Sequence, residues 1–142
     1  MKLRRWAVTL LVVLALPMLA TAADYRYVKP DLFRSWLEIG KKMVIVDIQA
    51  PTDFGKRHIK GAVETNAYPV KSAEERQRLD KVLAEIAATS SDVVIVCPRG
   101  GGGAKNTFDY LVSRGVAVER LYILEKGMEG WPYGEEQCAA GR

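Results

Sequence analysis

The sequence predicts an α/β domain with a central, mostly parallel, five-stranded sheet and helices on both of its faces. Two short, wholly apolar runs, residues 43–46 and 93–96, are typical of strands that flanking helices bury on both sides. Segments with helical periodicity separate the candidate strands, and this alternation is typical of βαβ units in a parallel sheet. The length of 142 residues suits one domain.

The first half of the domain is predicted to run strand, helix, strand. A short strand is expected at residues 25–28, ahead of the buried strand at 43–46. The helix between them should begin at Pro30 and end at Gly40, because proline is favoured in a first turn and glycine after a last one. Its apolar residues recur at helical spacing and are Leu32, Phe33, Trp36 and Leu37.

The second half repeats this alternation. A weaker strand is expected at 62–65 and an amphipathic helix at 73–88, before the buried strand at 93–96. A glycine-rich turn then leads into a helix from about residue 103 to residue 114, and the last strand is expected at 121–124. The residues on the apolar face of the first of these helices are Leu79, Val82, Leu83 and Ile86.

Composition and charge narrow the class of protein. Apolar residues make up 49% of the chain and charged residues 27%, which is ordinary for a globular protein. After residue 22 the chain carries 18 basic and 17 acidic residues, a net charge of +1, so no basic face for nucleic acid is expected. Two cysteines are too few for a disulfide scaffold or a zinc finger.

The N-terminus is predicted to be a signal peptide, residues 1–22, followed by a mature domain of residues 23–142. Positively charged residues 1–5 precede an apolar stretch, and Ala20-Thr21-Ala22 has the A-x-A pattern of a cleavage site. The mature protein would then be exported, to the periplasm in a Gram-negative bacterium, with no membrane association. The alternative is an uncleaved anchor, for which the uncharged run of 18 residues is at the short limit for spanning a bilayer.

The predicted reactive group is Cys97, at the end of the strand at 93–96. Ligands of open α/β sheets bind at the carboxyl ends of the strands. Four glycines, residues 100–103, follow the cysteine, and such a run lets successive N–H groups turn inward to bind an anion. With the dipole of the next helix, this favours the thiolate, which is the nucleophilic form. The alternative is a buried cysteine that acts as a small hydrophobic residue.

Three other loop motifs are excluded by counting. A phosphate-binding Walker loop needs glycine before its lysine, but Ala104 precedes Lys105. A dinucleotide fingerprint would need glycine at Lys105 or Asn106. A cysteine phosphatase loop needs arginine six residues after the nucleophile, where the chain has Gly103.

Four segments in the right order resemble the single-domain rhodanese-like sulfurtransferases, with a core at about residues 27–132. They are a strand ending in an acid (44–48), an acidic–aromatic…His-Ile-x-Gly-Ala signature (53–62), Cys97, and a Gly…Trp segment (124–131). The resemblance implies a rhodanese-like fold. It also implies a sulfurtransferase that moves sulfane sulfur from a donor such as thiosulfate or polysulfide to cyanide or a thiol. No cofactor and no metal are assigned.

The resemblance also implies roles for the residues around Cys97, which would carry the sulfur as a persulfide. The loop that cradles it would consist of Pro98, Arg99, Gly100, Gly101 and Gly102, with Asp47 and Gly103 as supporting residues. His58, the only histidine, occupies a structural position of the signature, and Trp131 is expected in the core.

Two departures from the family pattern affect these roles. Gly102 stands where many loops have an arginine, so Arg99 is the only cation of the loop and the candidate for meeting an anionic donor. We therefore expect weak thiosulfate turnover, and a wide mouth suited to a bulky or polysulfide donor. Gln49 stands where the family often has the arginine that pairs with the acid of the strand, here Asp47.

Two further functions stay open. One is a sulfur carrier or binding module that turns over no small donor. The other is a thiol–disulfide module in which Cys138, in the polar C-terminal tail, is the redox partner of Cys97. A tail thiol with no role, or one that links two chains, is the simpler explanation of Cys138. No oligomeric state is predicted.

Overall fold

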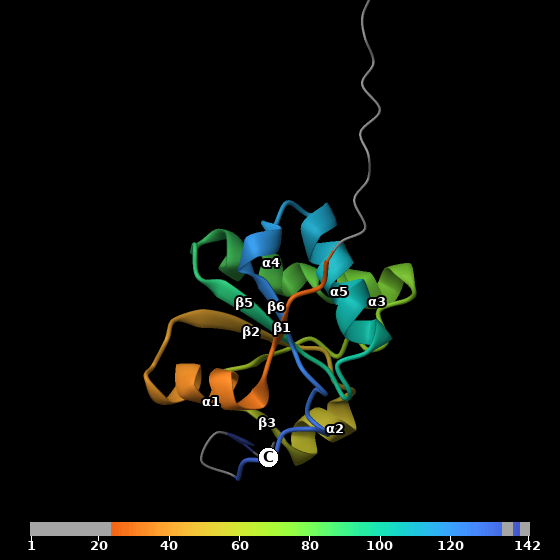
Figure 1. The fold of residues 1–142 in the computed structure, drawn as a ribbon. Helices are drawn as coiled ribbons and strands as arrows, with labels where there is room; N and C mark the ends of the chain where they lie inside the picture. Colours follow the sequence, from red (N-terminus) through yellow and green to blue (C-terminus); the bar gives the residue numbers. More distant parts are fainter. Residues whose placement is uncertain (1–23, 135–137, 140–142) are drawn as a thin grey trace, which may run out of the picture.

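The computed structural model describes residues 24–134 and 138–139 and contains a central sheet of five parallel strands (Figure 1). The strand order is β1-β6-β5-β2-β4, and every neighbouring pair is parallel. The strands are β1 (Tyr27–Val28), β2 (Met43–Asp47), β4 (Val63–Glu64), β5 (Asp92–Val96) and β6 (Leu121–Leu124). The predicted fold class is confirmed.

The two predicted buried strands, β2 and β5, pair with each other at the centre of the sheet. Their register runs from Met43 opposite Asp92 to Asp47 opposite Val96. Beyond the last pair, Ile48 N donates to Val96 O at 2.9 Å, so the two chains leave the sheet side by side. The segments after β2 and β5 therefore meet at the carboxyl edge.

Helices cover both faces of this sheet. In Figure 1, α3, α4 and α5 lie on one side and α1 lies on the other. The helices are α1 (Pro30–Glu38), α2 (Pro51–Lys56), α3 (Ala73–Gln77), α4 (Asp80–Ala87) and α5 (Gly102–Ser113), with a 3-10 turn η1 (Val118–Arg120) before β6.

The single helix predicted at 73–88 is wrong, because the chain forms α3 and α4 instead. Between them Arg78 donates from Nη1 to Asn66 O at 2.8 Å, and Leu79 turns fully into the core. The short helix α2 was not predicted from the sequence.

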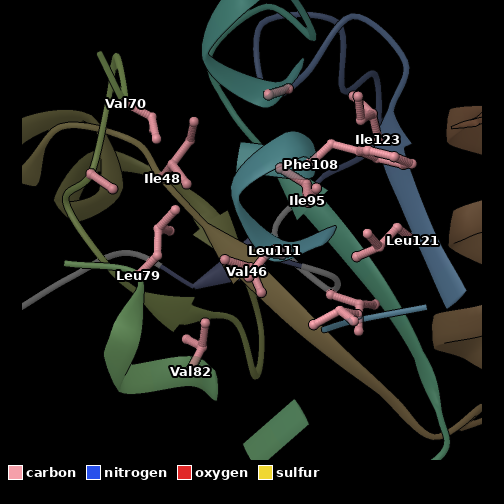
Figure 2. Close-up of a cluster of buried hydrophobic side chains, with 14 of the residues drawn as sticks. Val46, Ile48, Val70, Leu79, Val82, Ile95, Phe108, Leu111, Leu121 and Ile123 are labelled. Atoms are coloured by element: carbon pink, nitrogen blue, oxygen red, sulfur yellow. The ribbon is translucent and has the colours of Figure 1, made fainter. Parts of the chain in front are cut away.

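The core lies in two clusters, one on each face. Figure 2 shows the cluster under α4 and α5, in which Val46, Ile95 and Leu121 of the sheet pack beneath Phe108 and Leu111 of α5. The opposite cluster, under α1, is built by Val28, Phe33, Ile45, Ile59, Val94, Val96, Leu124, Met128 and Trp131. Side chains alternate between the faces along a strand, so Val96 joins the second cluster and Cys97 joins the first.

A second, two-stranded antiparallel sheet joins β3 (His58–Ile59) to β7 (Cys138–Ala139), with Ile59 opposite Cys138. Within the described residues, none of the helices is long and apolar enough to cross a membrane. The predicted signal peptide, residues 1–22, lies outside the described residues.

Candidate active site

A cysteine and its glycine-rich loop stand at the carboxyl edge of the central sheet. Cys97 directly follows β5, and the loop ends where α5 begins. The Sγ atom accepts a hydrogen bond from Gly100 N at 2.8 Å. Further backbone N–H groups that bond to this sulfur belong to Arg99, Gly101 and Ala104. The loop thus turns several N–H groups toward one sulfur atom, an arrangement that stabilises negative charge there.

The protonation of Cys97 depends on the balance between burial and these hydrogen bonds. The residue is only 1% exposed, and burial raises the pKa of its thiol because the charged form loses hydration. The N–H groups of the loop lower the pKa without offsetting burial. The expectation that the thiolate is favoured is therefore wrong in its net direction, because the sequence showed the loop but not the depth of the sulfur.

The turn after β6 braces the loop from behind. Met128 N donates to Cys97 O at 2.8 Å, and Glu129 N donates to Pro98 O at 2.9 Å. Gly127 makes this approach feasible: its φ is +57°, and a Cβ atom at this position would lie 2.2 Å from Cys97 O. Gly127 falls in a motif quoted above, but nothing in the sequence connects it to the cysteine.

The four glycines of the loop divide into two pairs. Gly100 has a φ of +72°, and a Cβ there would lie 2.8 Å from Lys126 N. A Cβ at Gly103 would lie 2.9 Å from the ring of Tyr68. By contrast, a Cβ at Gly101 or Gly102 would meet open space. Packing therefore requires two of the glycines, and the other two leave the loop uncovered.

The side chain of Arg99, the second residue after Cys97, is 70% exposed. Its Nε lies 3.9 Å from Oε1 of Glu129. The pKa of its guanidinium is raised, first by a side-chain hydrogen bond with Tyr68 and then by the carboxylate of Glu129. Arg99 thus lies between a hydroxyl and a carboxylate at the rim of the site. Tyr68 was not predicted as a site residue.

Asp47 is the last residue of β2 and is fully buried. It lies opposite Val96, the residue before Cys97, in the parallel pair of β2 and β5. Gln49 satisfies its carboxylate: the backbone N donates to Oδ1 at 2.9 Å and Nε2 donates to Oδ2 at 3.0 Å. Since this partner is neutral, burial dominates and raises the pKa of Asp47 to about 6, against the hydrogen bonds from Gln49. Asp47 therefore positions the segment after β2, and among the described residues its carboxylate accepts hydrogen bonds from Gln49 and not from Cys97.

The sequence matches the rhodanese-like domain family over residues 29–132. The chain belongs to this family. No curated protein matches its sequence.

Solved structures similar to this rhodanese-like domain include proteins that are described with different activities. Yeast Ygr203w, described as a protein tyrosine phosphatase of the rhodanese family, has a TM-score of 0.65 at 18% identity, over 86% of this chain and 96% of its own. A thiosulfate sulfurtransferase from Pseudomonas aeruginosa has a TM-score of 0.62 at 18% identity, over 83% of this chain and 20% of its own. A rhodanese-like domain protein from Staphylococcus aureus has a TM-score of 0.57 at 21% identity, over 82% and 99%. At these identities the likeness shows the fold.

In this rhodanese-like domain a hollow of about 290 Å³ opens beside the loop. It is lined by Gln49, Asp53, Arg57, Pro98, Met128 and Glu129. Arg57 is held in its wall, because Nη2 donates to Met128 O at 2.8 Å and to Trp131 O at 2.9 Å. Trp131 is itself buried, as expected. The hollow offers space for a small molecule next to the residue that follows Cys97.

His58 and Cys138 lie away from the loop along the chain. The ring of His58 stacks on Phe54 at 3.8 Å, and its Nδ1 lies 2.9 Å from Phe54 O, which ties β3 to α2. The backbone of Cys138 pairs with Ile59, and Ile59 packs on the face of the sheet opposite to Cys97. The side chain of Cys138 is not among the parts of the chain that the structure describes. No group of three or more potential metal ligands occurs in the part of the chain that is described.

Proposed function

We propose that this rhodanese-like domain is a sulfurtransferase that carries sulfane sulfur as a persulfide on Cys97. The observation that carries the proposal is the ring of N–H groups around Sγ, with Gly100 N at 2.8 Å. These donors suit a sulfur that becomes anionic in the reaction. Membership of the rhodanese-like family and the fold likeness to a thiosulfate sulfurtransferase support this function.

The reaction has two steps. The Cys97 thiolate attacks the outer sulfur of a donor such as thiosulfate, whose S–S bond breaks so that sulfite leaves with the electron pair. The outer sulfur of the new persulfide is then attacked by cyanide or by a thiolate, which yields thiocyanate or a new persulfide and returns the Cys97 thiolate. Arg99 is the cation available to an anionic donor at the rim of the loop.

A phosphatase activity is not favoured by the loop. Yeast Ygr203w is described as a phosphatase, but a cysteine phosphatase clamps its phosphoryl group with an arginine six residues after the nucleophile. That position is Gly103, which is buried beside Tyr68. The loop therefore offers backbone donors without the bidentate side chain.

The test is the intact mass of the purified protein before and after thiosulfate, with Cys97→Ser and Cys138→Ser variants as controls. A gain of one sulfur atom that only Cys97→Ser abolishes is the expected result. A loss of two hydrogens in the untreated protein, prevented by either variant, would instead favour the disulfide module. An unchanged mass would contradict thiosulfate as donor and leave the carrier function.

We propose further that the mature protein is exported after cleavage at Ala22, with a small sulfur donor and a thiol acceptor as its partners. The charged, apolar and small-residue segments of the N-terminus support this proposal. Intact mass of the protein purified from its native source tests it, and a retained Met1 would contradict it.

A further inference from the structure

Tyr68 is a large aromatic residue that no motif assigned to the site. It follows β4 in the chain, and its backbone N donates to Ile48 O at 2.9 Å, which fixes it to the end of β2. The next residue is also anchored, because Pro69 O accepts from Nδ2 of Asn106 in α5 at 3.3 Å. Although its backbone is held from two sides, the residue keeps 37% of its surface exposed. A fixed, partly exposed aromatic therefore stands at the carboxyl edge of the sheet.

The ring of Tyr68 closes one side of the Cys97 loop. A Cβ atom at Gly103 would lie 2.9 Å and 3.0 Å from two ring carbons and 3.3 Å from Cδ1 of Ile48. The space that a side chain at Gly103 would fill is thus already occupied by Tyr68. The positions before it, Gly101 and Gly102, border open space. The glycine-rich loop alone predicted a wide opening to Cys97. The ring of Tyr68 narrows this opening on the side of α5.

The hydroxyl of Tyr68 acts at the other end of the loop. It is a hydrogen-bond partner of Arg99, whose second partner is Glu129 at 3.9 Å, so the ring spans the loop from the start of α5 to its cationic side chain. Without the hydroxyl, Glu129 alone would hold Arg99. An ion pair with Glu129 neutralises the charge of Arg99 that an anionic reagent would meet. By binding Arg99, the hydroxyl of Tyr68 competes with this ion pair and keeps the guanidinium available to such a reagent.

We propose that Tyr68 is the specificity-determining residue of this site: its ring limits the size of the reagent that reaches Cys97, and its hydroxyl holds Arg99 for anionic reagents. The inference rests on the proposed function in one respect only, that the reagent is a sulfur donor. The restriction itself concerns access to the Cys97 thiol and can be measured without sulfur transfer.

The experiment is alkylation of Cys97 in a Cys138→Ser background, followed by intact mass. Three reagents separate size from charge: iodoacetamide is small and neutral, iodoacetate is small and anionic, and N-phenylmaleimide is bulky. Tyr68→Ala should raise the rate with N-phenylmaleimide relative to iodoacetamide by about tenfold or more, the scale on which pockets discriminate by size. Tyr68→Phe should leave that ratio unchanged and lower the rate with iodoacetate relative to iodoacetamide by about threefold, the scale of one hydrogen bond of ordinary net strength.

Tyr27→Ala is the matched control, because Tyr27 is an exposed tyrosine of β1, 43% exposed, outside the site. Unchanged rate ratios in a folded Tyr68→Ala protein, as judged by urea unfolding, would overturn the proposal. An equal acceleration by all three reagents would also overturn it, since it would indicate a loosened loop. If Tyr68→Ala does not fold, Tyr68→Leu provides the same comparison with more of the packing retained.

Sulfur donors complete the test and separate this inference from the proposed function. Thiosulfate is compared with a bulky aromatic thiosulfonate, and the persulfide is followed by mass. A shift in the alkylation ratios without a persulfide from either donor would refute the sulfurtransferase and leave the role of Tyr68 in place. Persulfide formation from both donors with equal efficiency in wild type and Tyr68→Ala would refute the role of Tyr68 in donor choice.

Discussion

Cys97 combines two opposing influences on one sulfur atom. Its loop donates N–H groups that favour the thiolate, and its depth in the protein favours the thiol more strongly. Such a nucleophile rests in its protonated form near neutral pH and is activated by losing a proton. The hydrogen bonds from the loop therefore stabilise the thiolate that reacts more than the thiol that is present at rest.

The reactivity of Cys97 should therefore still be rising at pH 9. Because burial raises the pKa of the thiol above its ordinary value, alkylation by iodoacetamide should accelerate about tenfold from pH 7 to pH 8 and continue to accelerate up to pH 9. The measurement uses the Cys138→Ser variant, in which Cys97 is the remaining thiol. The Cys97→Ser variant, measured separately, gives the rate for Cys138. A rate that levels off below pH 8 would contradict the raised pKa.

Arg99 is the residue on which the choice of an anionic donor depends. Replacing it by alanine removes the cation of the loop, so formation of the persulfide from thiosulfate should slow by about tenfold, the value of one charge-assisted hydrogen bond. Lys105→Ala is the control, because this cation of α5 lies over the ring of Tyr25. Efficient turnover that is insensitive to Arg99→Ala would exclude Arg99 from donor binding.

At the scale of elements, the site is an intersection of chain segments that leave the sheet at one edge. The segment after β6 donates to the carbonyls of Cys97 and Pro98, and the segment after β2 places Gln49 and Ile48 on the other side. The loop after β5 is held between them. The shape of the loop thus depends on its neighbours as well as on its own glycines.

Gly127→Ala tests this bracing. Its methyl group would lie 2.2 Å from Cys97 O, and the φ of +57° is unfavourable for alanine. We expect a loss of about 2–4 kcal/mol in the free energy of unfolding together with slower alkylation of Cys97, because the loop must shift. Urea unfolding and alkylation measure the two effects. Gly55→Ala in α2, where a Cβ meets nothing within 4 Å, is the control, and equal behaviour of the two variants would show that the turn does not brace the loop.

At the scale of the whole molecule, one buried acid links stability to pH. The pKa of Asp47 is about 6 in the folded protein against an ordinary value of 3.8, so the folded chain binds this proton more tightly than the unfolded chain does. The stabilising effect of that proton is fully present below about pH 4 and is lost as the pH rises through 6, because the ionised carboxylate must then stay buried beside neutral Gln49.

Asp47→Asn should therefore gain stability relative to wild type as the pH rises. Between pH 4 and pH 7 the difference in the free energy of unfolding should change by about 2 kcal/mol in favour of the variant. Urea unfolding at both pH values measures it. Glu85→Gln, at an exposed site of α4, controls for the loss of one negative charge. Parallel pH profiles for wild type and Asp47→Asn would refute the assigned pKa.

Much of this fold was predictable because its signals are local. The runs at 43–46 and 93–96 are wholly apolar, which is typical of strands buried on both faces of a parallel sheet. In the structure they pair with each other as β2 and β5. The position of Cys97 at the end of β5 follows from the same run. The break between α3 and α4 was missed, because Leu79 keeps the helical spacing of the apolar residues and the backbone of Arg78 and Leu79 stays close to helical.

The sequence by itself determined the parallel sheet, the family motifs and the loop in which Cys97 lies, since each depends on residues close together in the chain. Only the tertiary structure decided the protonation of Cys97, the partner of Asp47, the role of Gly127 and the presence of Tyr68 at Gly103. The physical reason is that burial and contact between distant residues arise when the strands align. That alignment brings the ends of β2, β4, β5 and β6 to one edge of the sheet.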